Sequence, residues 1–253
     1  MRKIAWILVF VLLAGLAVPA SAVSPAEILG TWYLSYFEFE GFAAVIPGDN
    51  RLELNRDATG VLVIAGEEKP LTWELKDYGA YVTEEEGTGD FTLMEDGVLK
   101  GPVRIGDGYT HDGFFTREQP PQIEIPAETE AANEDEYFGT YALSMQKIRD
   151  FVICFENGEE LLKAEIEFAL ITVSGSGLYY GSGEPIAVMS DYKDNKLIIP
   201  ADGILTGSPE DVLVISKTET GVMVTCEAVP NSVYYLTPVG ASEEAPEETG
   251  AGE

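Results

Sequence analysis

The chain has few of the side chains on which most enzyme and metal sites depend. Its 253 residues include one histidine, His111, and two cysteines, Cys154 and Cys226. A structural zinc site needs four cysteine or histidine ligands, so these three residues exclude one. Asp112 follows His111, but neighbours on a strand point to opposite faces and do not form a catalytic relay. The sequence also lacks a Gly-x-Ser-x-Gly or phosphate-loop motif, so it predicts no catalytic residue, no metal and no cofactor.

Basic residues are scarce too. The chain has 15 lysines and arginines against 44 aspartates and glutamates, which gives a formal net charge of −29 at pH 7. So acidic a chain repels phosphate backbones and anionic lipids, which argues against nucleic acid and membrane surfaces as partners. The acidic residues form no Asp-x-Asp-x-Asp-Gly calcium loop. We interpret the charge as a source of solubility outside the cell.

Only one long apolar run is present, and it lies at the start. Arg2 and Lys3 precede the apolar residues 4–18, and the small residues 20–22 follow. This order is typical of a secretory signal peptide, so we expect a mature chain that begins at Val23. The alternative is an uncleaved anchor, but the run is shorter than the roughly 20 residues of a spanning helix. We expect a secreted or cell-envelope protein with no membrane insertion after cleavage.

The two cysteines leave two alternatives open. Cys154 and Cys226 both lie in the second half of the chain, and an exported protein can join such a pair in a disulfide. Two free, buried thiols are the other interpretation, since nothing else in the sequence is typical of a disulfide-stapled fold.

A repeated hexapeptide indicates two similar halves. The sequence GTWYLS at 30–35 returns as GTYALS at 139–144, 109 positions later. Further along, residues 52–63 align with residues 169–180 in the same order. A candidate N-cap residue precedes each hexapeptide, Ser24 in the first half and Asn133 in the second. A glutamate lies three positions after each of them, which is the spacing of a capping box. We therefore expect a short helical turn and then a strand in each half.

The first half consists of short apolar-rich runs separated by turn signals such as Asp-Tyr-Gly and Gly-Asp-Gly. Eight such runs predict an up-and-down antiparallel sheet, and closure into a barrel removes its exposed edges. The runs are 32–39, 51–55, 61–65, 71–75, 80–83, 91–94, 98–105 and 109–117.

These patterns predict an all-β chain with two small barrels in tandem. We expect a signal peptide at 1–22, a first barrel at 23–118 and a Pro/Glu-rich linker at 119–132. A divergent second barrel follows at 133–239, and the small acidic residues 240–253 are typical of a disordered tail.

The order of motifs in the first half carries a resemblance to a family. GTWYLS, LNRDATGVL, TWELKD, MEDG and FFTRE follow one another between residues 29 and 118. The chain resembles small bacterial lipocalin-like domains, which occur in secreted, often duplicated proteins without a known activity. The resemblance implies that Trp32 closes the barrel floor and that Arg117 packs across it as a structural contact. In the second half Tyr141 stands in place of Trp32, and the closing run 233–237 ends without an arginine.

The apolar residues 41–47 connect the first two predicted strands. In lipocalin-type barrels this connection covers the open mouth, so the resemblance makes Phe42, Val45 and Ile46 candidate ligand-binding residues. The second half has a longer equivalent at 145–167, in which 159–164 can form a short helix. One hypothesis is a non-enzymatic module that binds a small apolar ligand or an extracellular protein at the first barrel's mouth. The alternative is a structural or interaction protein of the cell envelope, because short strands fill a small barrel with side chains.

Overall fold

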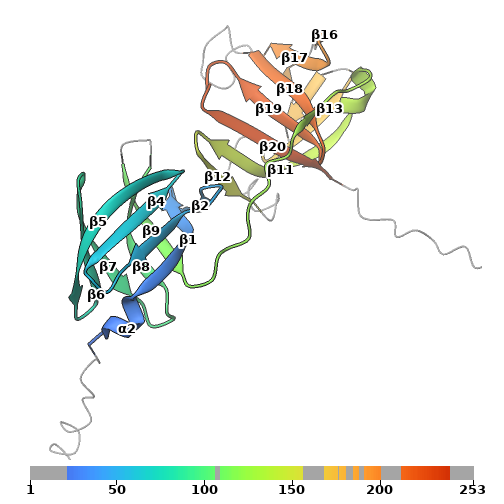
Figure 1. Ribbon diagram of the computed structural model, residues 1–253. Helices are drawn as coiled ribbons and strands as arrows, with labels where there is room; N and C mark the ends of the chain where they lie inside the picture. Colours follow the sequence, from blue (N-terminus) through green and yellow to red (C-terminus); the bar gives the residue numbers. More distant parts are fainter. Residues whose placement is uncertain are drawn as a thin grey trace, which may run out of the picture. The chain divides into compact units, whose positions relative to one another are not determined.

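The computed structural model divides into two units, Met1–Glu38 with Gly48–Pro121 and Phe39–Pro47 with Gln122–Glu253 (Figure 1). It describes residues 22–105, 109–155, 168–175, 177–180, 185–187, 191–200 and 212–239. The predicted signal peptide apart from its last residue, the predicted helix at 159–164 and the predicted acidic tail lie outside the described residues. Among the helices that the structure describes, none is both long and apolar enough to cross a membrane.

Unit 1 is a closed antiparallel barrel of eight strands, preceded by the short helix α2 (Pro25–Ile28). Each strand pairs with the next, and the last pairs with the first. The all-β antiparallel fold that the sequence predicts is therefore confirmed, with a barrel in the first half. The strands are β1 (Gly30–Phe39), β3 (Arg51–Leu54), β4 (Thr59–Ile64), β5 (Glu67–Lys76), β6 (Gly79–Glu84), β7 (Gly87–Leu93), β8 (Leu99–Arg104) and β9 (Thr110–Thr116).

Large side chains fill the interior of this barrel. Trp32, Phe37, Phe91 and Phe115 are each 2% exposed or less. A Cβ added to Gly101 would lie 2.2 Å from the Cδ1 atom of Phe91, so only glycine leaves room for that ring. Eight short strands enclose a space that side chains can occupy completely.

Local sequence explains the helical turn at the start of each unit. Ser24 donates from its backbone nitrogen and from Oγ to the Glu27 carboxylate, at 2.8 and 2.6 Å, which closes the predicted capping box. In unit 2 the equivalent turn is the 3₁₀ helix η1 (Glu134–Tyr137), and the Asn133 side chain accepts from the Asp135 nitrogen at 3.0 Å. A glycine follows each turn and begins the next strand.

Unit 2 is also an antiparallel sheet. Its pairings run without a break from β16 through β17, β18, β19, β20, β11, β13 and β14 to β15. Residues 188–190, between β15 and β16, lie outside the described residues. The strands are β11 (Gly139–Ile148), β13 (Leu170–Ser174), β14 (Gly177–Tyr180), β15 (Pro185–Ala187), β16 (Asp191–Lys193), β17 (Lys196–Pro200), β18 (Val212–Thr218), β19 (Val222–Cys226) and β20 (Ser232–Pro238).

The segment predicted as a linker, 119–132, is partly built into unit 2. Its strand β10 (Glu128–Thr129) pairs with β18, and Ala131 is 2% exposed within the apolar core of that unit. The boundary between units falls after Pro121. The Pro/Glu-rich composition concealed a small apolar residue that packs into the core, so the predicted linker is too long.

The segment after β1 differs most from the prediction. The chain reverses at Glu40 and Gly41, whose φ angles are 49° and 87°, and such two-residue turns match the twist of a β-hairpin. The residues that follow form β2 (Phe42–Val45), which pairs with β12 (Phe151–Cys154) of unit 2. Phe39–Pro47 therefore belongs to unit 2, and its residues Phe42–Val45 form a strand where the sequence predicts a loop.

Candidate functional site

A cavity of about 240 Å³ opens in unit 2 beside β11, β12 and β2. Aromatic side chains make up half of its lining, and the others are aliphatic, carboxylate and amide groups. The lining residues are Phe39, Phe42, Phe155, Tyr234, Ile148, Ile153, Glu40 and Gln146.

Strand register brings the lining residues of β11, β12 and β20 to one face. Gln146 lies opposite Ile153 on one side and opposite Tyr234 on the other. Alternate residues of a strand share a face, so Ile148 lies on the face of Gln146, and Phe155 continues the face of Ile153. The backbone nitrogen of Phe155 donates to the Ser144 carbonyl at 2.9 Å, which extends the β11–β12 pairing to this residue.

Strand β2 supplies only one of the three residues predicted to bind a ligand. Ala44 lies opposite Ile153, so Phe42, two positions earlier, shares that face and lines the cavity. Val45 points to the other face, while Ile46 is 4% exposed after the end of β2, and neither lines the cavity. The prediction grouped the three residues because it interpreted 41–47 as a loop; in a strand, alternation separates them.

The aromatic walls are held by ring contacts within unit 2. The Phe42 and Phe155 rings meet edge to face, with centroids 5.8 Å apart, a geometry that aromatic pairs favour. Buried Phe151 supports Phe39, and Phe168, 2% exposed, supports Tyr234. The centroid separations of these two pairs are 4.8 and 4.9 Å. The walls are thus packed in place before any ligand arrives.

The polar groups of the cavity are few and of different kinds. The lining residues with polar side chains are Glu40, Gln146 and Tyr234. The lining contains no histidine, cysteine, lysine or arginine. This arrangement can bind and orient a molecule, but it lacks the adjacent nucleophile and base of acyl or phosphoryl transfer.

The predicted contact between Trp32 and Arg117 is present in unit 1. The guanidinium carbon lies 3.6 Å from the centroid of the indole, which is 1% exposed. Arg117 also donates to the carbonyls of Thr31 and Glu27, at 3.2 and 2.6 Å, and the indole nitrogen donates to the Ile28 carbonyl at 2.8 Å. Burial lowers the pKa of the Arg117 guanidinium. Every partner here is a backbone carbonyl of α2 or of the start of β1.

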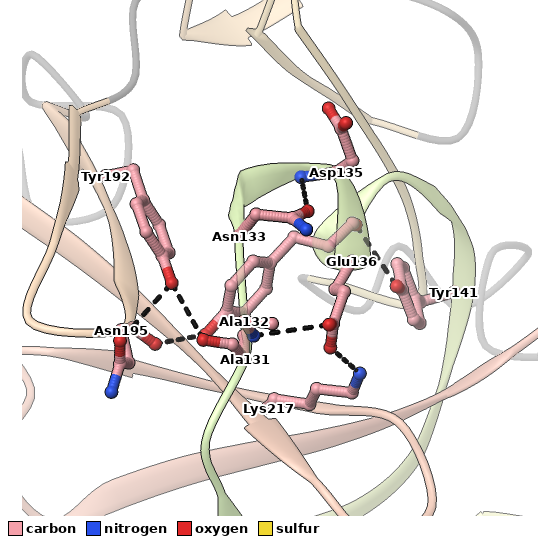
Figure 2. A network of polar contacts seen from close by, with 10 residues as sticks. Ala131, Ala132, Asn133, Asp135, Glu136, Tyr141, Tyr192, Asn195 and Lys217 are labelled. Atoms are coloured by element: carbon pink, nitrogen blue, oxygen red, sulfur yellow. Dashed lines mark hydrogen bonds and ion pairs between the residues drawn. The ribbon is translucent and has the colours of Figure 1, made fainter.

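Tyr141 occupies the equivalent position in unit 2 (Figure 2). Its hydroxyl donates to the Tyr137 carbonyl at 3.1 Å, four residues earlier, as the Trp32 indole does in unit 1. Tyr137 is fully buried, and its own hydroxyl donates to the backbone carbonyl of Asn195.

A further set of polar contacts lies beside Tyr137. Tyr192 donates to the Ala131 carbonyl at 2.8 Å and lies 3.4 Å from the side chain of Asn195 (Figure 2). Glu136 accepts from the Ala132 nitrogen at 3.2 Å and pairs with Lys217 of β18. These contacts join the chain before η1 to two strands of the sheet.

The two cysteines are free rather than bonded to each other. Cys154 is exposed at the end of β12, and Cys226 is 5% exposed at the end of β19. The disulfide that an exported pair permits is therefore absent, and the alternative of two buried thiols holds only for Cys226.

His111 and Asp112, which are neighbours in β9, contact different residues. The His111 ring lies 5.3 Å from the Phe37 ring, and Asp112 forms an ion pair with Lys100 at 2.7 Å. In the described part of the chain, no group of three or more His, Cys, Asp or Glu residues could hold a metal ion.

Comparisons with protein families, with curated proteins and with solved structures found no match to this chain.

Proposed function

We propose that the chain is an exported, non-enzymatic binding module of two lipocalin-like barrels, and that the cavity of unit 2 holds a small, mostly apolar molecule. The observation that carries this proposal is the lining, in which four aromatic residues face an open cavity of about 240 Å³ together with Glu40 and Gln146. Ligand sites are typically concave and apolar, with a few polar groups that fix orientation. At roughly 30 Å³ per water molecule, the cavity corresponds to about eight waters, which suits a molecule with one substituted ring.

Matching irregularities support the tandem arrangement. The pairing of β1 with β9 shifts register between Leu34 and Tyr36. The pairing of β11 with β20 shifts between Leu143 and Met145, 109 positions later. Bulges are specific features of a strand, so their recurrence at equivalent positions favours duplication of one ancestral barrel.

The packed interior of unit 1 favours a scaffold role for that barrel. Its largest side chains meet in the centre, and glycines such as Gly101 and Gly113 make room for them. The lipocalin-like floor formed by Trp32 and Arg117 adds to the rigidity of the same unit. We therefore propose the ligand site in unit 2 and not at the mouth of the first barrel.

A structural or interaction protein of the cell envelope is the second candidate. The filled barrel of unit 1 favours it, because a filled barrel needs no ligand to be stable. The two candidates differ in whether the cavity of unit 2 takes up an apolar molecule.

An uncharged, environment-sensitive dye with one substituted ring, 4-dimethylaminobenzonitrile, distinguishes them. We expect saturable emission enhancement by the native chain, with weaker uptake by Phe42→Ser, which removes one aromatic wall. Val45→Thr is the matched control, because it adds a hydroxyl in the same strand on the opposite face, and it should bind like the native chain. If folded native protein takes up no dye, the binding module is wrong and the envelope candidate stands.

A further inference from the structure

The lining of the unit 2 cavity includes an acidic residue but no basic one among the described residues. Among the described residues of this lining, Glu40 is the one that carries a charge, and it lies in the two-residue turn between Phe39 and β2. Both residues of this turn have positive φ, and Glu40 is exposed.

Two basic residues, Lys147 and Arg149, are neighbours in sequence of the lining residue Ile148, but neither is part of the lining. Lys147 lies between Gln146 and Ile148 on β11, so alternation directs it to the opposite face of the strand. Arg149 is exposed in the turn after β11 and is not part of the lining. The chain as a whole carries a net charge of −29, which raises the local concentration of cations.

Aromatic rings attract cations through the negative charge on their faces. Four aromatic residues, Phe39, Phe42, Phe155 and Tyr234, line the same small volume as the carboxylate. A ligand anion would meet the carboxylate without a basic side chain in the lining to balance it. A cation with an apolar body satisfies both the walls and the carboxylate.

We propose that the occupant is a small organic cation, such as an arylalkylamine or an aryl quaternary ammonium ion. Its apolar body packs among the aromatic residues, and its charged head lies towards Glu40. This inference rests on the proposed binding function and narrows it to one class of ligand.

The test is calorimetric titration of the purified full chain with three probes of similar size: benzyltrimethylammonium, benzyl alcohol and phenylacetate. We expect the cation to bind roughly tenfold more tightly than phenylacetate, with benzyl alcohol between them. Glu40→Gln should weaken the cation about twofold to fivefold and leave benzyl alcohol unchanged. Glu219→Gln is the matched control, because it removes one negative charge from the exposed β18–β19 turn of the same unit.

Phe42→Leu distinguishes the attraction of a cation to the aromatic ring from apolar contact. Leucine keeps an apolar wall but has no ring face, so the cation should lose about twofold to fivefold in affinity while benzyl alcohol binds as before.

The outcomes distinguish this inference from the proposed function. Equal binding of benzyl alcohol and the cation, unaffected by Glu40→Gln, overturns the cation preference and keeps the binding module. Preference for phenylacetate overturns it as well. If circular dichroism shows a folded chain that binds none of the probes, both proposals fail.

Discussion

The two units form the same hydrogen bond at the start of their first long strand but secure the aromatic residue differently. The indole of Trp32 donates to the Ile28 carbonyl, and the hydroxyl of Tyr141 donates to the Tyr137 carbonyl, each four residues earlier. In unit 1 the guanidinium of Arg117 then covers the ring. Unit 2 has no arginine in β20, and tyrosine hydroxyls bonded to backbone carbonyls lie beside Tyr141 instead.

The difference shows which part of the pattern is local. A short helical turn, a glycine and an aromatic residue with a hydrogen-bond donor recur in both units within about ten residues of chain. The group that completes the floor comes from a distant strand, so it can differ without disturbing the turn. Unit 1 relies on a large aromatic surface and one cation, whereas unit 2 relies on several weaker polar contacts.

The largest expected effect is that of Trp32→Ala. The substitution removes a ring that is 1% exposed, together with the surface on which Arg117 packs, and should lower the free energy of unfolding of unit 1 by about 3–5 kcal/mol. Trp73 remains in unit 1 as a fluorescent reporter of denaturant unfolding. A decrease below about 1 kcal/mol would be too small for a buried tryptophan and would contradict the structural role of the stack.

Arg117→Met should have the next largest effect. It removes the cation above the indole and leaves the carbonyls of Thr31 and Glu27 without this donor, so unit 1 should lose about 1–2 kcal/mol. Arg117→Lys keeps the charge but not the planar guanidinium, so its stability should lie between those of the native chain and Arg117→Met. Arg56→Met, at an exposed residue, serves as the control in the same fluorescence measurement. If it lowers the stability of unit 1 as much as Arg117→Met does, the loss of a positive charge explains both effects and the stack on Trp32 does not.

Tyr141→Phe should have a smaller effect, confined to unit 2. Only the hydroxyl is removed, so the Tyr137 carbonyl loses one hydrogen bond and unit 2 should lose about 1 kcal/mol. Circular dichroism follows this transition. Tryptophan fluorescence should not change, because the described tryptophans, Trp32 and Trp73, lie in unit 1. A loss of stability equal to that of Trp32→Ala would mean that Trp32 and Tyr141 do not differ as their contacts indicate.

The smallest effect concerns the ion pair of Glu136 and Lys217. The hydrogen bond from Lys217 is the main reason that the Glu136 pKa lies below its ordinary value of 4.5, with a contribution from the Ala132 nitrogen. A depressed carboxylate pKa stabilises the folded state above 4.5, and this stabilisation is lost as the pH falls through the lower folded value. Lys217→Met should therefore slightly lower the unfolding midpoint of unit 2 at pH 7. In strong acid, where Glu136 is protonated, the substitution should no longer change that midpoint.

Glu136→Gln is the companion variant for that measurement. The two substitutions together should have no more effect than the larger one alone, because each removes the same pair. An effect of Lys217→Met that persists unchanged in strong acid would show that lysine packing, rather than the ion pair, is responsible.

Part of the candidate site could be predicted from the sequence. Both segments singled out as connections near a barrel mouth, 41–47 and 145–167, supply lining residues, Phe42 among them. The apolar residues 42–45 and the glycine before them, Gly41, are signals of a hairpin that a loop interpretation overlooked. No local signal predicts Tyr234, which reaches the cavity because β20 pairs with β11.

The sequence by itself determined the all-β class, the capping box of Ser24 and Glu27, the turns and the aromatic residue after each helical turn. These features depend on contacts within a few residues, and hydrophobic alternation and turn chemistry specify them directly. The second capping box that the sequence predicts, at Asn133, does not form, because Asn133 accepts from Asp135 and Glu136 accepts from Ala132. Only the tertiary structure decided that β2 pairs with β12 and that Phe42, Gln146 and Tyr234 line one cavity. The reason is that strand pairing uses backbone groups common to all residues, so the partner of a short apolar strand is selected by the packing of the whole unit.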